Sequence, residues 1–265
     1  MERLEDVRYA TQDGVAIITI DRPERMNAFR AQTVDELVAC FEQAWVDREV
    51  GAIVLTGAGD RAFCAGGDQK QRAETGDYGP SAGGRMQLDR LHRLIRDVPK
   101  PVIAAVNGDA VGGGHVLQVL CDLSVAAETA RFGQAGPRVG SFDAGFGTGY
   151  LARIVGEKRA RELWFLCELI DAKTAKEWGL VNRVVPAAEV LPTALEMGRR
   201  AASLSPTAIA FLKHAFNTDT EHLAGTQRLA DEGLALFVTT DEAAEGAAAF
   251  SEKRPPRFGR FRRKA

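Results

Sequence analysis

Short, continuous apolar runs constrain the fold of this chain more than any other feature of its sequence. They lie at residues 15–20 (VAIITI), 52–56 (AIVLT), 102–106 (VIAAV) and 123–127 (LSVAA). Runs of this length without alternation are typical of strands that are covered on both faces, as in parallel sheets. Helical patterns lie between them, and the first, at residues 33–45, has Thr33 as its expected N-cap and Glu36 three residues further on. Strands that alternate with helices predict an α/β fold.

The last third of the sequence changes character. From about residue 191 onward nearly all of the pattern is helical. Pro206 is expected at the first position of a helix after Ser205, and acidic residues open another helix at residues 241–251. We therefore expect a core at residues 1–190 that carries the site, and a C-terminal helical region with a basic tail at residues 191–265.

Composition excludes several classes of protein. The 265 residues are 45% hydrophobic and 26% charged with a net charge of −2, so neither a disordered chain nor an electrostatic nucleic-acid binder is expected. No apolar run approaches the roughly 18 residues of a membrane-spanning helix, and the charged first residues do not resemble a signal peptide. We therefore expect a cytoplasmic protein with no membrane partner. The cysteines are too far apart for a zinc site, and no bound metal is expected: Cys40, Cys64, Cys121 and Cys167.

Two glycine-rich stretches each follow an expected strand. The first, residues 57–68, begins with a loose dinucleotide-binding pattern, but no amphipathic helix opens inside it, so an NAD site is not expected. The second contains the triplet Gly112–Gly114 and runs into an apolar helix start. Both stretches offer backbone N–H groups that no bulky side chain crowds. Two such groups aimed at one oxygen form an oxyanion hole, which stabilises a thioester enolate or a tetrahedral intermediate.

A third glycine-rich stretch, residues 132–147, places Ser141 and Asp143 two residues apart, on one side of the chain if it is extended. Two interpretations remain open from the residues alone: the pair serves acid–base chemistry, or it caps a helix expected at residues 150–155. His115, beside the glycine triplet, is expected to pack at the start of its helix. A Ser141/His115/Asp143 triad is not favoured, because two of its members are only two residues apart.

Several longer motifs point to one family. They are residues 22–29 (RPERMNAF), 63–68 (FCAGGD), 107–114 (NGDAVGGG), 121–123 (CDL) and the pattern AxxxGLV at residues 175–181. With them the chain resembles the crotonase (enoyl-CoA hydratase/isomerase) superfamily over almost its full length. The resemblance implies a spiral of ββα units, a C-terminal helical trimerisation region, and a homotrimer or dimer of trimers. It also implies a small-molecule acyl-CoA substrate, with coenzyme A as part of the substrate and no permanently bound cofactor.

The same resemblance assigns roles to individual positions. It gives the oxyanion-hole N–H groups to Gly67 and Gly113. Family hydratases carry one glutamate two residues after the glycine triplet and a second after Phe-Gly-Gln-Pro, and here these positions hold Val116 and Gly136. Because both carboxylates that would handle water are missing, the sequence argues against classical enoyl-CoA hydration and leaves generic hydratase or isomerase activity as a minor alternative.

Two narrower classes resemble the chain more closely. Residues 67–70, 114–117 and 140–143 are similar to 1,4-dihydroxy-2-naphthoyl-CoA synthases, which close a ring by a Dieckmann-type condensation. Residues 27–30, 51–64, 96–102 and 216–220 are similar to 2-ketocyclohexanecarboxyl-CoA hydrolases, which open a ring with water. Synthases of this kind hold a bicarbonate base beside a Gln-Thr-Gly stretch and a tryptophan. The chain departs from the synthase pattern at four positions, and the last of these departures also affects the hydrolase pattern: Met26, Ala135, Phe146 and Val238.

On this resemblance we expect hydrolytic opening of a cyclic β-keto acyl-CoA, with ring closure as the alternative and a catalytically inactive binding protein as a further possibility. Asp143 is the leading acid–base candidate, Ser141 is expected to hold its partner or a substrate oxygen, and Tyr78 to supply a phenol from a lid loop. Further contacts with the substrate or its coenzyme A are expected from Ala28, Ala65, Gly66, Asp68, Gln69, Lys70, Val111, Gly112, Gln134, Gly136 and Lys253.

Overall fold

A six-stranded sheet forms the centre of the molecule. The computed structural model describes residues 4–143 and 145–262. The strands follow the order β1 (Val7–Gln12), β2 (Val15–Ile20), β3 (Ala52–Gly57), β5 (Val102–Val106), β7 (Leu123–Ala127) and β10 (Arg183–Val185). Only the β1–β2 pair of this sheet is antiparallel. Every residue of β3 and β5 is buried, which is the environment that their continuous apolar runs predict.

A second sheet carries the loops of greatest interest. Its four short strands have the order β4 (Ala62–Cys64), β6 (Asp109–Val111), β8 (Arg131–Gly133) and β9 (Ile170–Asp171). Strands β4, β6 and β8 are parallel, so their carboxyl ends meet at one edge. The glycine-rich stretches found in the sequence leave β4, β6 and β8 at that edge.

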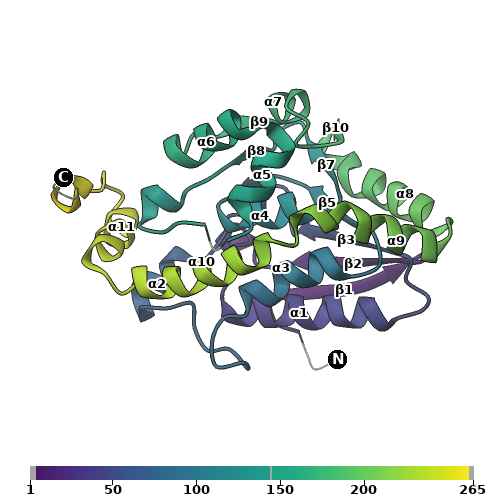
Figure 1. The fold of residues 1–265 in the computed structure, drawn as a ribbon, viewed down its shortest axis with the longest axis horizontal. Coiled ribbons are helices and arrows are strands. Elements are labelled where there is room, and N and C mark those ends of the chain that lie inside the picture. Colours follow the sequence, from purple (N-terminus) through teal and green to yellow (C-terminus); the bar gives the residue numbers. More distant parts are fainter. Residues whose placement is uncertain (1–3, 144, 263–265) are drawn as a thin grey trace.

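Helices cover the six-stranded sheet from both sides (Figure 1). Helix α1 (Ala31–Val46) runs along β1 and β2, and α8 (Val190–Ala202) packs against β3, β5 and β7. The others are α2 (Gln69–Thr75), α3 (Leu88–Asp97), α4 (Gly113–Leu120), α5 (Gly147–Val155), α6 (Glu157–Leu166), α7 (Ala172–Glu177), α9 (Pro206–Asn217), α10 (Leu223–Phe237) and α11 (Asp241–Ser251). No helix in the described residues is long and apolar enough to cross a membrane.

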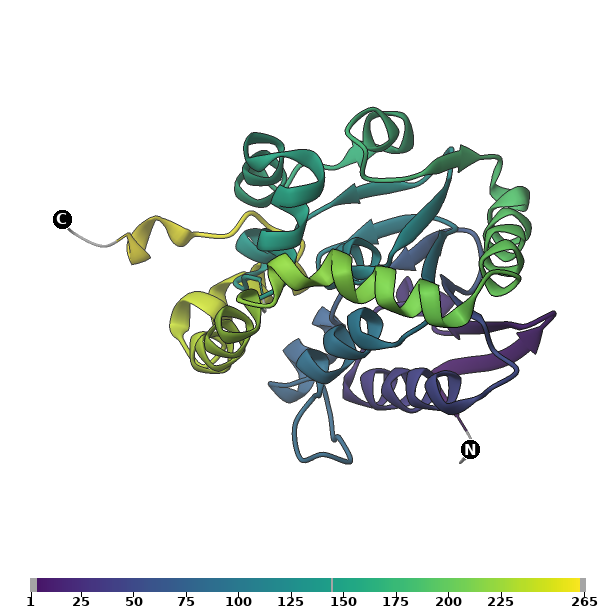
Figure 2. The same ribbon diagram turned by 45° about the vertical axis from the view of Figure 1, so that its right-hand side comes forward.

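Helix α8, at the start of the expected C-terminal region, packs on the central sheet. Helix α8 opens at Val190, and a Cβ on its Gly198 would lie 3.0 Å from the Val15 side chain of the central sheet. This helix therefore covers the sheet, and the expected division of the chain at residue 190 stays a prediction. Helices α10 and α11 lie at the end of the molecule opposite α8, and the chain after α11 leaves the body of the fold (Figure 2).

Local signals predicted the strands better than the helix starts. Three of the four expected strands have the observed bounds, and β3 extends one residue further than expected. The expected cap of α9 is confirmed, because the Ser205 Oγ accepts a hydrogen bond from the Ala208 N–H. The expected cap of α1 is wrong. This helix begins at Ala31 with Arg30 as its N-cap, and Thr33 lies inside the first turn, where its Oγ1 accepts from the Arg30 N–H at 3.1 Å.

Glu36 holds the start of β1 rather than capping α1. Its buried carboxylate accepts three backbone hydrogen bonds, from the N–H groups of Glu5, Asp6 and Val7, at 2.8, 2.8 and 2.9 Å. This side chain thereby joins two segments that lie about thirty residues apart in the sequence. A charged acceptor with several donors contributes more than a neutral hydrogen bond.

Replacing Glu36 with glutamine should lower the free energy of unfolding by about 1–3 kcal/mol, because one amide oxygen cannot serve three buried donors. Chemical denaturation of both proteins measures the difference. The matched control is Glu42→Gln on the same helix, whose carboxylate is exposed and pairs with Arg90, and whose loss should cost less than about 0.5 kcal/mol. Equal effects of the two substitutions would contradict the anchoring role of Glu36.

Candidate active site

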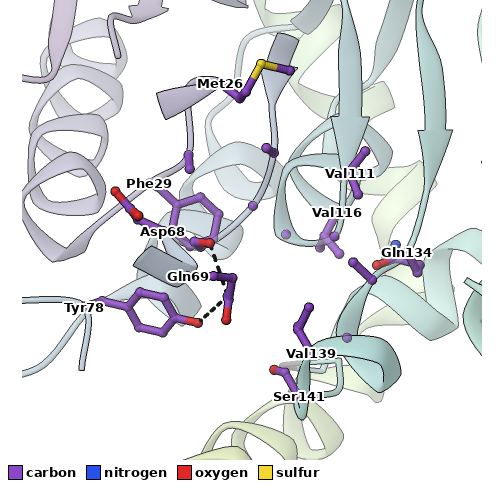
Figure 3. Close-up of a pocket in the computed structure, with 18 of the residues that line it drawn as sticks. Met26, Phe29, Asp68, Gln69, Tyr78, Val111, Val116, Gln134, Val139 and Ser141 are labelled. Carbon is purple, nitrogen blue, oxygen red and sulfur yellow. Dashed lines mark hydrogen bonds between the residues drawn. The ribbon is translucent and has the colours of Figure 1, made fainter. Parts of the chain in front are cut away.

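One cavity of about 480 Å³ lies where the glycine-rich stretches meet (Figure 3). Its mouth carries charge, with exposed Glu24, Arg61 and Lys70. Its interior is mostly apolar and includes buried Leu88 and Val116. In Figure 3, Gln69 and Tyr78 lie on one side of the open space, with Val139 and Ser141 across from them. The cavity therefore suits a ligand that has charged groups at one end, which would lie at the mouth, and an apolar group at the other.

A bridge between Phe29 and Gly67 fixes one wall of this cavity. The Phe29 N–H donates to the Gly66 carbonyl at 2.8 Å, and the Asp68 N–H donates to the Phe29 carbonyl at 2.9 Å. In a parallel bridge of this type the N–H of the opposed residue, here Gly67, points away from the partner strand. No acceptor in the described part of the chain meets the Gly67 N–H. This donor remains free for a ligand in the cavity.

The glycine triplet supplies a second free donor at the start of α4. Gly112 is the N-cap with φ +57° and ψ −126°, a conformation that side chains rarely adopt. Gly113 is the first residue of the helix, so its N–H has no partner within the helix. Gly114 has no room for a side chain, because a Cβ there would lie 1.9 Å from the Cys64 carbonyl oxygen.

The two free donors come from loops in direct contact. A Cβ on Gly66 would lie 3.0 Å from the Gly113 nitrogen, so residues 65–67 pass immediately beside the helix start. Gly67 and Gly113 both line the cavity. This arrangement has the two elements of an oxyanion hole, which are two backbone N–H groups and an adjacent space for the oxygen.

A buried polar network fixes the loop that carries Phe29. Asn27, with φ +52°, donates from its Nδ2 to the carbonyls of Ala58 and Ala62, at 2.9 and 2.7 Å. Arg22 donates to the Ala28 carbonyl and to the Asp68 carboxylate, the latter at 3.0 Å. The other Asp68 oxygen caps α2. Asp68 therefore positions the loop through its buried carboxylate, and it also lines the cavity, so its expected contact with the substrate stays a prediction.

Asp143 both caps a helix and lines the cavity. Its carboxylate accepts from the N–H groups of Gly145, Gly147 and Thr148, at 3.1, 3.1 and 2.5 Å, which fixes the start of α5. A Cβ built on Gly147 would lie within 2.9 Å of the Asp143 Oδ1, the Val116 side chain and the Trp164 ring alike. The carboxylate therefore lies beside Val116, the position where family hydratases carry their first glutamate. The capping interpretation of Asp143 is confirmed, and the acid–base interpretation stays a prediction.

The expected contact residues are brought together with one exception. Tyr78 packs its ring against Gly67, and its hydroxyl accepts a hydrogen bond from the Gln69 side chain at 3.1 Å. Gln134 is buried and bonds to the His115 ring at 3.1 Å. Lys253 does not line the cavity of its own chain. The remaining expected residues that line it are Ala28, Ala65, Gly66, Gln69, Lys70, Val111, Gly112, Gly136 and Ser141.

The cavity residues that sequence reasoning missed include His92 on α3 and Trp164 on α6. Both line the cavity, and both have buried side-chain nitrogens with no partner in the described residues. Neither lies in a glycine-rich motif. The sequence did contain one signal for His92. It follows Leu88 by four residues, which places both side chains on the apolar face of the same helix.

The fold and this site define an enzyme-like α/β protein of the crotonase type. The family model described as enoyl-CoA hydratase/isomerase matches residues 10–261. The chain belongs to this family.

Solved structures agree with this assignment. The chain is similar to a carnitinyl-CoA hydratase from Mycobacterium avium, with 32% identity and a TM-score of 0.84 over 97% of this chain and 99% of that one. It is also similar to an enoyl-CoA hydratase from Mycobacterium avium subsp. paratuberculosis K-10, with 29% identity and a TM-score of 0.85 over 97% and 99%. An enoyl-CoA hydratase/isomerase from Pseudoalteromonas atlantica T6c has 28% identity and a TM-score of 0.86 over 96% and 100%.

Gly114→Ala should destabilise the protein by about 3 kcal/mol, because the added Cβ meets a backbone oxygen that cannot move alone. Thermal melting measures the loss. Gly225→Ala on α10 is the matched control, since nothing lies within 4 Å of its Cβ position, and it should leave the melting temperature unchanged or raise it. A Gly114→Ala protein as stable as the control would mean that the contact between the two loops is looser than described.

Proposed function

We propose that this protein is an acyl-CoA enzyme that opens the ring of a cyclic β-keto acyl-CoA by hydrolysis. The observation that carries the proposal is the pair of free N–H groups at Gly67 and Gly113 in one cavity with the Asp143 carboxylate. In this proposal the two N–H groups bind the thioester oxygen, and the carboxylate handles the proton. The residues need no metal and no redox cofactor for this chemistry.

The proposed reaction balances with water alone. A water molecule gives one proton to the base and adds to the ring ketone, forming a carbon–oxygen bond. The bond between the former ketone carbon and the α-carbon then breaks, and its electron pair moves to the α-carbon as a thioester enolate. The N–H groups of Gly67 and Gly113 stabilise the enolate oxygen. Protonation of the α-carbon completes a dicarboxylic acid monothioester.

Asp143 is the proposed base, with Ser141 and Tyr78 as its polar neighbours in the cavity. Backbone donors fix the Asp143 carboxylate in place without the cost of ordering a flexible side chain during the reaction. The Ser141 Oγ has no partner in the described residues and is free to hold the attacking water or the ketone oxygen. Tyr78 faces the same space from the opposite side (Figure 3).

Hydration of a linear enoyl-CoA is disfavoured by the local packing. Val116 lines the interior and is 4% exposed, so an apolar side chain occupies the position of the first hydratase glutamate. A Cβ on Gly136 would lie 3.1 Å from the Ser141 carbonyl oxygen, which leaves little room for the second. The relatives named as hydratases therefore do not fix the reaction of this chain.

Ring closure is the second candidate. It is favoured by Trp164, which lies beside Asp143, because the synthase pattern includes a tryptophan near the base. A bicarbonate base of the synthase kind fits the residues poorly, because Ala135 replaces the threonine hydroxyl that the synthase pattern supplies. A trimer or a dimer of trimers is proposed by family resemblance, and exposed apolar side chains on α9 and α10 are consistent with such contacts: Phe211, Phe216, Leu229 and Leu236.

Mass spectrometry of incubated thioesters tests the proposal directly. With 2-ketocyclohexanecarboxyl-CoA we expect the gain of one water to give pimeloyl-CoA. Loss of water from o-succinylbenzoyl-CoA would instead identify the ring-closing reaction. Hydration of crotonyl-CoA in preference to both would make this chain a hydratase despite Val116 and Gly136, and would overturn the proposal.

Asp143→Asn should lower the turnover of the active thioester by about 100-fold or more, because asparagine retains a capping oxygen but cannot accept the proton. Steady-state kinetics measure the loss, and thermal melting checks that α5 stays capped. The control is Asp109→Asn, at the mouth of the same cavity, whose carboxylate pairs with Arg131 at 2.6 Å. Near-normal turnover in the Asp143 variant would remove this residue from the chemistry.

A further inference from the structure

His92 is a polar side chain in the interior of the cavity that the proposed reaction does not use. The imidazole is 1% exposed, and neither ring nitrogen has a hydrogen-bond partner in the described residues. A buried polar group without a partner costs free energy, so such a group beside a cavity indicates a missing ligand atom. Trp164 is the other cavity residue with a buried, unpartnered nitrogen, and it lies beside Asp143.

Apolar groups surround His92. It lies on the buried face of α3 with Leu88, and its ring centroid is 6.3 Å from that of Phe146. Burial lowers the pKa of His92 to about 4, so the ring is neutral at physiological pH. A neutral imidazole offers one N–H donor and one acceptor nitrogen. This end of the cavity can therefore bind an uncharged oxygen of a ligand.

The distribution of charge in the cavity argues against a carboxylate on the acyl group of the ligand. The cationic side chains that line the cavity are Arg61 and Lys70, which are exposed, and Arg25, which is partly exposed. None of the buried lining residues in the described part of the chain is a lysine or an arginine. The interior instead contains the Asp143 carboxylate. A carboxylate on the acyl group would meet the negative charge of Asp143 here and no buried cation among the lining residues.

We propose that His92 selects the acyl group by hydrogen bonding to an uncharged oxygen on it. The substrate class is then a coenzyme A thioester of a compact, mostly apolar acid with one keto or hydroxyl oxygen and no carboxylate. This inference rests on the proposed function and deepens it, because a cyclic β-ketone meets the requirement and a succinylbenzoyl group does not.

Binding of three thioesters that the proposed ring opening cannot cleave tests the selection separately from turnover. The probes are cyclohexanecarboxyl-CoA and its 2-hydroxy and 2-carboxy derivatives, none of which has a ketone to cleave. By calorimetry the 2-hydroxy compound should bind the wild-type protein about five- to tenfold more tightly than the parent, as expected for one neutral hydrogen bond. The 2-carboxy compound should bind more weakly than the parent. Tightest binding of the 2-carboxy compound would overturn the inference.

His92→Leu should abolish the preference for the 2-hydroxy compound and leave the affinity for the parent within about twofold, because leucine keeps the volume but loses the hydrogen bond. His222→Leu, at an exposed position, is the matched control and should keep the preference. An unchanged preference in His92→Leu would contradict the role of His92. If that variant does not fold, ring ¹⁵N spectra of the wild type decide, since only the 2-hydroxy compound should shift the His92 signals.

These outcomes separate the two proposals. Loss of ring opening with an intact His92-dependent preference would leave the selection standing and discard the reaction. Ring opening without a His92-dependent preference would support the proposed reaction and contradict the selection by His92. Removal of water from the bound 2-hydroxy compound, visible by mass spectrometry, would indicate hydratase chemistry and contradict the proposed function alone.

Discussion

The two hydrogen bonds between Phe29 and the loop at residues 66–68 are the contact on which the site depends. They occupy the Gly66 carbonyl and the Asp68 N–H, and so leave the N–H of the residue between them directed away from the bridge. The close approach of Gly66 to the Gly113 nitrogen then brings the second free donor alongside. Both donors belong to the backbone and are fixed before any ligand arrives, which is the condition under which an oxyanion hole lowers a barrier most.

Ion pairs in the protein interior fix the position of the bridge between Phe29 and Gly67. Arg22 pairs with Asp68 and lies 3.6 Å from Asp6, which in turn binds Arg30 at 2.7 Å. Burial alone would raise the pKa of Asp6, but hydrogen bonds from Arg30 and Thr33 and nearby positive charge outweigh it, and the pKa is lowered. The charges are thus paired rather than free, and removing one partner would leave a buried charge uncompensated. These ion pairs fix the positions of the loops. The Asp143 carboxylate and the neutral His92 imidazole line the cavity, where a ligand can contact them.

How much the sequence could predict depends on whether a feature is local. Strands β2, β5 and β7 were predicted because a continuous apolar run reports burial on both faces by itself. The glycine triplet predicted the start of α4 because it is also a local signal, read from neighbouring residues alone. The start of α1 was missed because Asp6 and Glu36 tie it to a distant strand, and His92 and Trp164 were missed because only the folded chain brings α3 and α6 to one cavity. Asp143 stayed ambiguous in the sequence because a carboxylate at this position suits both the helix cap that the structure shows and the proposed base.

The most direct test of the account is the infrared stretching frequency of the thioester carbonyl in bound ¹³C-labelled cyclohexanecarboxyl-CoA. Two fixed N–H donors on one oxygen should polarise the carbonyl and move its stretch to a lower frequency than in free solution. The shift should persist in Asp143→Asn, which leaves Gly67 and Gly113 untouched. A carbonyl that vibrates at its solution frequency when bound would contradict the claim that these two N–H groups form an oxyanion hole.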